Sequence, residues 1–521
     1  MSYAVWGWGA AADEPRREDL LAAAPWVAGL LGFDAQDPET PSALRDLPPP
    51  RFDADVFGEL GSVAPADRAR HGLGRSYRDV VRGIRGDVPH VPDVVVRPRT
   101  ASDVADVLER CAESRWAVVP FGGGSSVVGG VEPVLPDGSD LRGVVSLDLG
   151  AMGGVPEVDA VSRAARIGAG ALGPDLEREL ATSGHTLRFY PQSFERSTLG
   201  GWIATRAAGH FATGPTHIDD LVESITAVTP GGMWASRRLP ASGAGPSPDR
   251  LLLGSEGTLG VITEAWVRVQ PRPEHRAGTA VTFGSWTAGA TAVRRIVQAG
   301  LRPAGCRLVD STEARLTGTS SDSRAVLVLS FESADHPVDA DLARASEICA
   351  DSAGVVMPRE DGGGASGRWR ETFLRAPYLR ETLVLLGVLT ETFETAVTWD
   401  RFEAFIDDVR AATADAARRV CGAGEVTCRI THAYPDGAAP YFTVLAPARR
   451  GSELAQWAEI KAAAAEAIGR GGGTITHHHA VGRDHRRWYD AQRPDVFAAA
   501  LTAAKSAVDP QAILNPGVLL G

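Results

Sequence analysis

The sequence predicts an α+β protein built from several structural units, and three observations support this fold class. Its 521 residues exceed one domain of roughly 150 residues, so two to four units are expected. The apolar fraction of 44% and the charged fraction of 23% are typical of a chain that folds around buried cores. Strand and helix patterns alternate after residue 90, which predicts a β-α-β unit there.

The charge balance argues against a nucleic-acid partner. The chain has 53 Lys and Arg against 65 Asp and Glu, a net charge of −12, and lysine occurs only at Lys461 and Lys505. The sequence therefore shows no basic stripe that could neutralise a phosphate backbone.

The five cysteines and the apolar residues 20–33 indicate where in the cell the protein is expected. An odd number of cysteines without a C-x-x-C pair argues against a disulfide framework and a thiolate zinc site, and favours a reducing, cytoplasmic location. Residues 20–33 are apolar but contain Pro25 and follow several acidic residues, so we expect neither a signal peptide nor a transmembrane helix.

The first regular elements lie between residues 91 and 121. Residues 1–87 are interpreted as a partly helical lead-in outside the core, because three prolines at 48–50 form a stiff linker. Strands are expected at 91–98 and 116–121, with a helix at 100–115 between them. The helix follows from apolar residues at helical spacing and from Thr100 and Asp103, which are placed as a capping pair.

The second strand leads into the glycine-rich run Gly122–Gly124, followed by Ser125 and Ser126. Three residues without Cβ atoms let backbone N–H groups converge on an anion such as a phosphate, although a flexible turn is an equally good interpretation of this run alone. The spacing differs from G-x-G-x-x-G, and the turn-rich residues 127–143 follow, which disfavours a nicotinamide cofactor.

Further elements are expected at 144–149 and 164–168, both strands, and at 174–183, a helix. Residues 198–209 have the small side chains of a helix that packs closely against a neighbour, with hydroxyls near its start. Residues 251–263 suggest a strand, a glycine turn and a second strand, which on its own predicts a β-hairpin.

Four segments, residues 120–126, 191–197, 204–207 and 256–262 in this order, resemble the flavin-contacting segments of the vanillyl-alcohol oxidase / p-cresol methylhydroxylase superfamily. The resemblance implies a two-subdomain FAD-binding domain of the p-cresol methylhydroxylase type and FAD as cofactor. The residues that it assigns to the cofactor are Pro120, Phe121, Gly122, Gly123, Gly124, Ser125, Ser126, Pro191, Gln192, Ser193, Ser197, Thr198, Gly200, Gly201, Ala204, Thr205, Arg206, Ala207, Glu256, Gly257, Thr258, Leu259, Gly260, Val261 and Ile262. His71 is the candidate for covalent attachment, but it lacks the Gly-His-Ser arrangement of that family, so non-covalent FAD is expected.

The second half resembles alkyldihydroxyacetonephosphate synthases through segments 302–310, 378–380, 391–401, 431–442 and 477–479. That family exchanges an acyl ester for a fatty alcohol and forms an ether lipid precursor without net redox change. The resemblance implies a lipid-like phosphate substrate, a homodimer and possible proximity to a membrane surface. The alternatives are an FAD-linked oxidase or dehydrogenase of a 2-hydroxy acid or related alcohol, and a flavin-binding protein without turnover.

Six residues are the candidates for chemistry. The resemblance assigns Arg380 to substrate phosphate and Tyr441 to acid–base work, and it gives Arg307 a similar role to Arg380. Each also has an ordinary interpretation: Arg380 as a surface residue, Arg307 as an ion-pair partner of Asp310 or Glu332, and Tyr441 as a strand aromatic.

His477, His478 and His479 complete the candidates. If they lie on a strand, His477 and His479 share one face and His478 points to the other. Phosphate binding with carbonyl polarisation, structural hydrogen bonding and metal ligation are the three alternatives. We expect no metal site, because the sequence shows no further cluster at ligand spacing.

Two positions depart from the family pattern. Ala480 stands where glycine usually follows the three histidines, and Arg196 stands where an aromatic residue is usual. The resemblance gives the expected division: a lead-in over 1–87, the FAD-binding domain over 88–272, an α/β cap domain with an antiparallel sheet over 273–430, and a C-terminal region over 431–521 that returns to the flavin.

Overall fold

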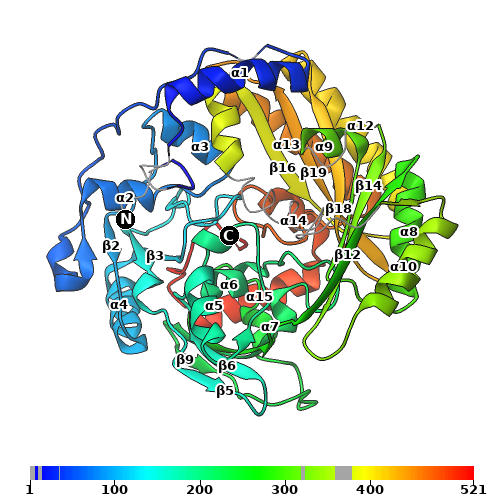
Figure 1. Ribbon diagram of the computed structural model, residues 1–521. Helices are drawn as coiled ribbons and strands as arrows, with labels where there is room; N and C mark the ends of the chain where they lie inside the picture. Colours follow the sequence, from blue (N-terminus) through cyan, green and yellow to red (C-terminus); the bar gives the residue numbers. More distant parts are fainter. Residues whose placement is uncertain (1–5, 10–13, 35, 318–322, 358–377, 521) are drawn as a thin grey trace.

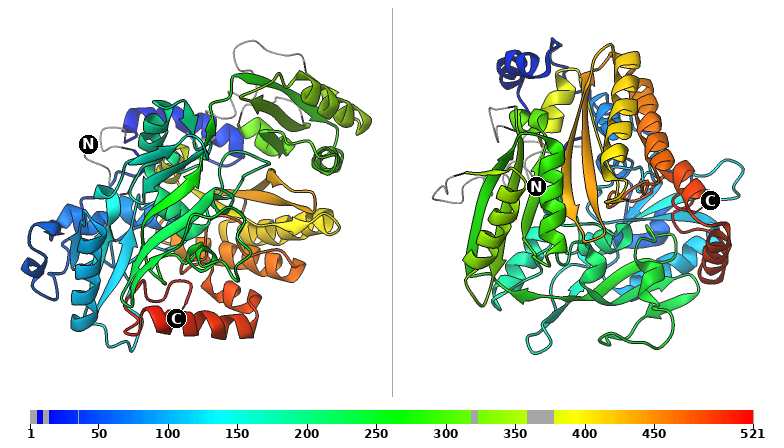
Figure 2. Two further views of the ribbon diagram at one scale, coloured as in Figure 1. Left: turned by 90° about the horizontal axis from the view of Figure 1, so that it is seen from below. Right: turned by 90° about the vertical axis from the view of Figure 1, so that its right-hand side faces the viewer.

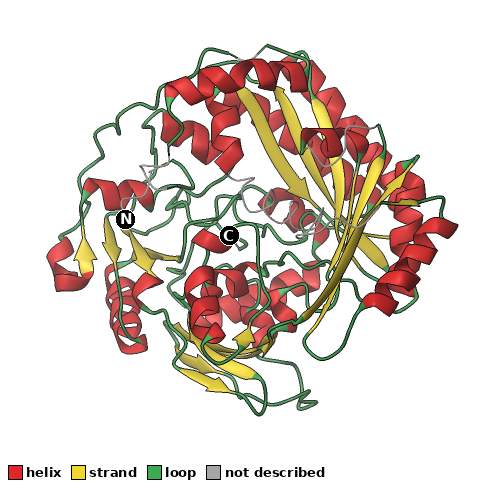
Figure 3. Cartoon of the chain, viewed as in Figure 1, coloured by secondary structure: helices red, strands yellow, loops and turns green. Residues whose placement is uncertain are grey.

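The computed structural model describes residues 6–9, 14–34, 36–317, 323–357 and 378–520. Three main sheets and their helices lie around a central region that is rich in loops (Figure 1, Figure 3). Among these residues, no helix is both long and apolar enough to cross a membrane.

The first sheet contains the predicted β-α-β unit. Strands β2 (Val94–Val96), β4 (Gly143–Asp148) and β3 (Trp116–Phe121) are parallel, and β1 (Gly61–Ser62) pairs antiparallel with β2. Helix α4 (Ala101–Ser114) begins after Thr100, whose side chain accepts from the Asp103 backbone N–H in a capping box, as expected. The predicted strand at 91–98 is shorter than expected.

The second sheet is antiparallel and supports the glycine-rich segments. Its strand order is β5 (Glu157–Asp159), β6 (Ala164–Gly168), β10 (Val261–Arg268), β8 (Val222–Thr229) and β9 (Gly232–Ala235). Helices α5 (Gly173–Ala181) and α6 (Leu199–Thr205) bury Leu176, Leu180 and Trp202 in the same core cluster as the strand residues Ile167 and Ile225. Strands β7 (His185–Thr186) and β11 (Gln270–Pro271) pair antiparallel in a separate two-stranded sheet.

The predicted hairpin at 251–263 is wrong in its first half. Residues Asp249–Leu252 form the short helix α7, which buries Leu252 and leaves Leu251 37% exposed. Gly254, Glu256 and Gly257 then have φ of 78°, 50° and 75°, a left-handed series that prevents strand pairing before β10 begins.

The third sheet is antiparallel and the largest. Its order is β15 (Val355–Val356), β12 (His275–Phe283), β14 (Ala325–Ser333), β13 (Gly305–Val309), β18 (Glu425–Ala433), β19 (Gly437–Pro447) and β16 (Val388–Glu394), and β17 (Val397–Thr398) also pairs with β19. The expected boundary at 430 falls inside β18, so the sheet continues across that position.

Helices cover this large sheet and fill the main core. They are α8 (Trp286–Gln298), α10 (Asp339–Asp351), α12 (Phe402–Cys421) and α13 (Glu453–Gly471). Figure 2 shows α12 beside the strands of the sheet, where it contacts β18 and β19. The rings of Phe393 and Phe442 stack at 4.9 Å in the core beneath these helices.

Part of the expected lead-in belongs to this core, contrary to the prediction. Helix α3 (Tyr77–Ile84) buries Tyr77, Val80 and Ile84 in the main core cluster and contacts α13. Its start is fixed by a capping box between Ser76 and Asp79. The prediction of a lead-in relied on the proline run at 48–50 and did not consider this local signal. The other elements are α1 (Arg17–Leu31), the 3₁₀ helix η2 (Ala54–Leu60), α2 (Pro65–Arg70), η3 (Leu149–Ala151), η4 (Phe194–Arg196), η5 (Ile218–Asp220), α9 (Ser311–Leu316), α14 (Arg486–Gln492) and α15 (Asp495–Val508).

Candidate functional site

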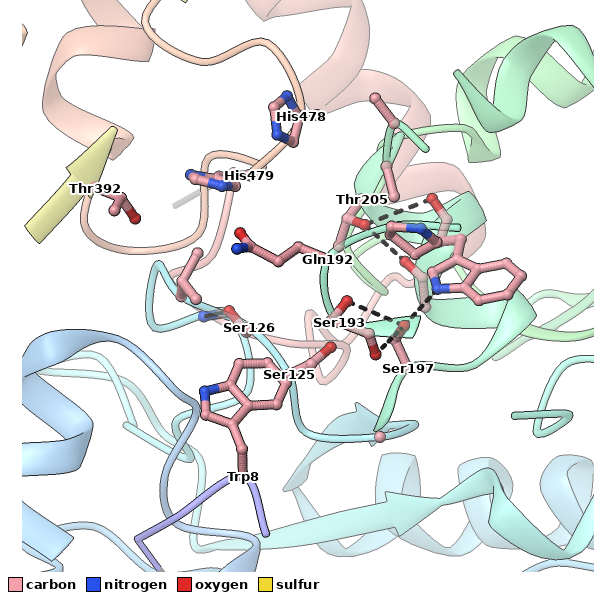
Figure 4. A pocket seen from close by; sticks show the side chains of 18 of the residues that line it. Trp8, Ser125, Ser126, Gln192, Ser193, Ser197, Thr205, Thr392, His478 and His479 are labelled. Atoms are coloured by element: carbon pink, nitrogen blue, oxygen red, sulfur yellow. Dashed lines mark hydrogen bonds between the residues drawn. The ribbon is translucent and has the colours of Figure 1, made fainter. Parts of the chain in front are cut away.

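A cavity of about 850 Å³ lies between the three sheets and gathers most of the predicted site residues (Figure 4). From the predicted cofactor segments, it is lined by Pro120, Phe121, Gly122, Gly123, Gly124, Ser125, Ser126, Pro191, Gln192, Ser193, Ser197, Thr198, Gly200, Gly201, Ala204, Thr205, Ala207, Glu256, Gly257, Gly260 and Ile262. From the predicted catalytic residues, it is lined by Arg307, Arg380, Tyr441, His478 and His479.

The glycine run at the end of β3 makes a close backbone contact with residues 196–198. A Cβ atom on Gly123 would lie 1.5 Å from the Arg196 carbonyl oxygen, and one on Gly122 would lie 2.3 Å from Thr198 Oγ1. Gly124 has a φ of 67°, which favours glycine. The run therefore packs directly on the second predicted segment, and its three glycines line the cavity together with Ser125 and Ser126.

Hydroxyl groups fix the start of α6 against the cavity. Thr198 accepts from the Gly201 N–H as the N-cap, and Ser197 Oγ accepts from Trp202 Nε1 at 2.6 Å. Ser197 Oγ also donates to the Ser193 carbonyl at 2.9 Å. Figure 4 shows Ser193 and Ser197 side by side before the start of this helix, and a helix start is a region that favours anions.

Glu256 links the last predicted segment to the C-terminal part of the chain. Its carboxylate accepts from the backbone N–H groups of Val481 and Gly482 at 2.9 and 2.8 Å. Burial raises the pKa of Glu256 to about 7. The Asn515 side chain, which also lines the cavity, donates to the Glu256 and Gly130 carbonyls at 2.7 and 3.0 Å.

One face of the large sheet forms the opposite wall. Because side chains alternate along a strand, each strand sends every second residue into the cavity and the others into the helix-covered core. The cavity side carries Arg307 of β13, Thr427, Arg429 and Thr431 of β18, Tyr441, Thr443 and Leu445 of β19, and Thr390 and Thr392 of β16.

Tyr441 lies in a cationic and aromatic environment. It is 3% exposed, and the Arg429 guanidinium lies 3.9 Å from its ring centroid. Arg429 also pairs with Glu313 at 2.6 Å, which fixes the guanidinium on the ring. The rings of His478 and His479 have centroids 6.1 and 5.6 Å from that of Tyr441, so phenol and imidazoles share one end of the cavity.

Arg380 enters the cavity from the helical residues 378–385. Its guanidinium donates to the Arg75 carbonyl and to Thr392 Oγ1, both at 3.1 Å. These two bonds orient the side chain, which lines the cavity and has further N–H donors.

The next residue, Glu381, anchors the N-terminal segment. Its carboxylate accepts from the Trp8 backbone N–H, and burial raises its pKa to about 7. Trp8 is 6% exposed and lines the cavity, and its indole N–H has no protein partner among the residues described here.

Arg307 is 2% exposed and donates to the His210 carbonyl. Burial lowers its pKa to about 9, and the neighbouring Arg429 adds to this effect. The two carboxylates considered as its ion-pair partners are engaged elsewhere: Asp310 with Arg410 at 3.0 Å and Glu332 with Arg188 at 2.5 Å.

The expected strand at the three histidines is wrong. Residues 477–479 form a series of bends, and His478 and His479 both line the cavity, although they were expected on opposite faces. His477 lies outside the lining and contacts Tyr434 Oη at 2.9 Å and His217 Nε2 at 3.1 Å. The buried Glu394 carboxylate accepts from the backbone N–H groups of His477 and His479, and this pattern is incompatible with a regular strand.

The structure brings further possible metal ligands to the histidines, which the sequence reasoning did not foresee. His432 joins His477 and His478, and Glu394 joins His478 and His479, each group with ligand atoms within 4.8 Å of one another. Hydrogen bonds already occupy these groups: His432 Nε2 lies 3.0 Å from the Gly209 carbonyl, and Thr476 Oγ1 donates to Glu394 at 2.7 Å. We therefore assign no metal to them.

Four predicted cofactor residues lie outside the lining. Arg206 pairs with Asp219 at 2.7 Å, and the Thr258 hydroxyl donates to the Ser255 carbonyl at 2.7 Å. Leu259 and Val261 are buried in the cores. These residues shape the segments without reaching the cavity.

His71 also lies outside the lining. It is 1% exposed, with Nδ1 2.8 Å from the Asp67 carbonyl and Nε2 3.3 Å from Asp148. Ala480 has a φ of 72°, a conformation that explains why glycine is usual at this position.

Sequence reasoning missed Arg429, His432, Glu394 and Trp8 as parts of the site. The first three lie within or beside the segments that carry the resemblance, but only sheet register shows which of their side chains face the cavity. Trp8 is brought in by Glu381, a contact between residues that are far apart in the sequence.

Comparisons with known proteins agree with this architecture. Two family profiles match: the FAD binding domain over residues 92–236 and the C-terminal domain of FAD linked oxidases over residues 272–519. An alkyldihydroxyacetonephosphate synthase of Caenorhabditis elegans is 30% identical, and the alignment covers 95% of this chain and 88% of the relative.

Solved structures show the same arrangement. An alkyldihydroxyacetonephosphate synthase superposes with a TM-score of 0.77 at 25% identity and covers 95% of this chain and 92% of its own. A p-cresol methylhydroxylase with bound substrate has a TM-score of 0.69 at 14% identity, over 89% of this chain and 94% of its own, which shows a shared fold alone. The expected α+β fold of the p-cresol methylhydroxylase type is confirmed.

Proposed function

The chain belongs to the alkyldihydroxyacetonephosphate synthase family, and on this premise we propose that it exchanges the acyl group of an acyl-dihydroxyacetone phosphate for a long-chain alcohol. It is an FAD-dependent enzyme, as its two matching family profiles and its relatives show. The observation that carries the proposal is a single cavity in which a glycine-rich anion cradle lies opposite Arg380, Tyr441 and His479.

The cavity fits a flavin dinucleotide. The backbone at Gly122 and Gly123 approaches the neighbouring segment so closely that Cβ atoms there would collide with it. A glycine run of this kind can present its backbone N–H groups to a pyrophosphate. We propose that this run and the start of α6 hold FAD, together with Glu256 and Gly257. When bound, the flavin supplies the covalent and electron-transfer chemistry that side chains lack.

The chain's own residues would bind the substrate and move protons. Arg380 suits the phosphate, because its guanidinium is held by Arg75 and Thr392 and keeps further donors for phosphate oxygens. Tyr441 would accept the proton next to the ketone, from a position that the Arg429 guanidinium over its ring helps to fix. His479 would polarise the ketone oxygen from the same end of the cavity.

We propose that FAD is held without a covalent bond, because the buried His71 is engaged by Asp67 and Asp148 outside the cavity.

A lipid-like substrate is supported by Leu379, which lines the cavity and is 45% exposed at the surface. All five cysteines are free thiols, which supports the proposed cytoplasmic location. A homodimer and contact with a membrane surface remain predictions of the resemblance.

The test is substrate exchange by the purified holoenzyme. Incubation with hexadecanoyl-dihydroxyacetone phosphate and hexadecanol should release hexadecanoate and form the ether product in equal amounts, measured by mass spectrometry, whereas FAD-free protein should form neither. Anaerobic bleaching of the flavin by a 2-hydroxy acid, with no fatty acid released in the exchange assay, would instead support the oxidoreductase alternative.

A further inference from the structure

Glu394 is a buried carboxylate that the proposed chemistry does not use. It lies at the end of β16, is 1% exposed and pairs across the sheet with Tyr441. Cross-strand partners share a face, so Glu394 lies beside the phenol on the cavity side of the sheet. A buried charge in this place needs compensation from its surroundings.

The compensation comes from the loop that carries the histidines. Glu394 accepts from Thr476 Oγ1 and from the His479 backbone N–H, both at 2.7 Å, and from the His477 backbone N–H. One carboxylate therefore sets the bends of residues 476–479, which explains why His478 and His479 both reach the cavity.

The same carboxylate contacts the imidazole of His479. Glu394 Oε1 lies 3.4 Å from His479 Nδ1, while His478 Nδ1 is 3.8 Å from Oε2. Although burial raises it, the pKa of Glu394 falls to about 2 through the adjacent histidines and these hydrogen bonds, so Glu394 is an anion at neutral pH. With Nδ1 directed at the carboxylate, Nε2 is the His479 nitrogen left to act on a ligand.

We propose that Glu394 is a positioning residue that fixes His479 beside Tyr441 and supplies the counter-charge for its protonated form. The proposal deepens the proposed function, on which it rests for the identity of the substrate. A carboxylate that orients an imidazole and stabilises its protonated state is a recurring device for proton-transferring histidines. The imidazolium would donate from Nε2 to the substrate's ketone oxygen and from Nδ1 to Glu394.

The charges around His479 show why this anion matters. Burial lowers the pKa of His479, and the nearby cations Lys461 of α13 and Arg380 lower it further. Glu394 and, to a smaller extent, Glu391 of β16 oppose them, and the other groups that face this cluster are His477, His478, His485 and Tyr441. Without Glu394 the buried imidazole would lose its main stabilising anion.

The first test is the pH profile of turnover in Glu394→Gln. The variant keeps the side-chain volume and one acceptor oxygen but removes the charge, so the alkaline limb should move to lower pH by about one unit and kcat at pH 7.5 should fall about 10- to 100-fold. FAD content should not change. Glu394→Asp, which restores the charge, should recover part of the activity and return the limb toward the wild-type position.

Glu177→Gln is the matched control. Glu177 also accepts from one hydroxyl, that of Thr186, and from the backbone N–H groups of Leu187 and Arg188. It lies outside the cavity. Its substitution should change stability without moving the pH profile. A purely structural role of Glu394 predicts the same behaviour for both variants, and that result would overturn the proposal.

A second readout does not depend on the substrate. Imidazole ¹⁵N NMR of histidine-labelled holoenzyme, with the His479 signal identified by its loss in His479→Gln, should show protonation at lower pH in Glu394→Gln than in the wild type. If no exchange activity is found but this shift is present, the proposed function fails and the coupling stands. An unchanged His479 titration in a folded Glu394→Gln protein would refute the coupling itself.

Discussion

Tyr441 differs from an ordinary strand tyrosine in what surrounds its ring. Arg429 lies over one face, two imidazoles lie nearby and little solvent reaches it. Tyr441→Phe removes only the hydroxyl, so kcat for acyl exchange should fall by about 10²- to 10⁴-fold, the usual contribution of a general acid or base. FAD binding should not change. Tyr489→Phe, outside the cavity, serves as the control and should retain full turnover.

Arg380 gives a prediction that concerns binding more than chemistry. Arg380→Lys keeps the charge but cannot bond Arg75 and Thr392 and also present a fork of donors to a phosphate. We expect KM for the phosphate substrate to rise about 10-fold or more, because a hydrogen bond to a charged group contributes about 1.5–3 kcal/mol. Steady-state kinetics would measure this. Equal kinetics in Arg380→Lys and in Arg410→Lys, a variant at the Asp310 ion pair, would contradict it.

Single residues also show where sequence reasoning reached its limit. Arg380, Tyr441 and His479 could be predicted because ordered motifs surround them. Arg429 and Glu394 could not, since strand register places Arg429 in the cavity lining and a contact between distant segments joins Glu394 to the histidine loop. Nothing local in the sequence distinguishes Glu394 from Glu391, which lies on the opposite face and bonds Trp457 and Lys461.

Among the elements, the glycine run after β3 has the least room for change. In Gly123→Ala the new methyl group would meet the Arg196 carbonyl at 1.5 Å, so either this run or the segment before α6 must move. We expect the purified variant to fold but to lose most of its bound FAD, measured by the ratio of flavin to protein absorbance. Gly284→Ala, where no atom lies within 4 Å of the added Cβ, should retain its flavin.

Elements with local signals were predictable, and elements shaped from a distance were not. Helix α4 has its own capping box and apolar face, so its predicted range agrees with the structure within one residue at each end. The histidine loop takes its shape from Glu394, and the short helix α7 is followed by left-handed residues that the sequence pattern did not indicate. In these places tertiary contacts override the local pattern.

The pH dependence of stability is a property of the whole molecule. Burial lowers the pKa of several histidines below 6.5, so without substrate the folded chain binds fewer protons on them in acid than the unfolded chain does. Their effect is a loss of stability as pH falls through about 6.5. The histidines concerned are His217, His432, His477, His478, His479 and His485.

Glu256 and Glu381 have the opposite effect. Burial raises the pKa of both to about 7, so the stability they contribute is complete below about pH 4.5 and is lost as pH rises through 7. Six histidines outweigh these two carboxyl groups between pH 7.5 and 5.5, and each net proton changes stability by about 1.4 kcal/mol per pH unit. The unfolding midpoint should therefore be lower at pH 5.5 than at pH 7.5, at constant ionic strength. An equal or higher midpoint at pH 5.5 would contradict this assignment of charges.

The cavity takes walls from near both ends of the described chain, with Trp8 on one side and Asn515 on another. Asn515 is held by β3, because its backbone N–H donates to the Val118 carbonyl and the Val118 N–H donates to the Ile513 carbonyl, both at 2.8 Å. A ribosome makes these residues hundreds of codons apart. The cavity therefore lacks one of its walls until residue 515 has been synthesised, and we expect the flavin to be loaded only after that point.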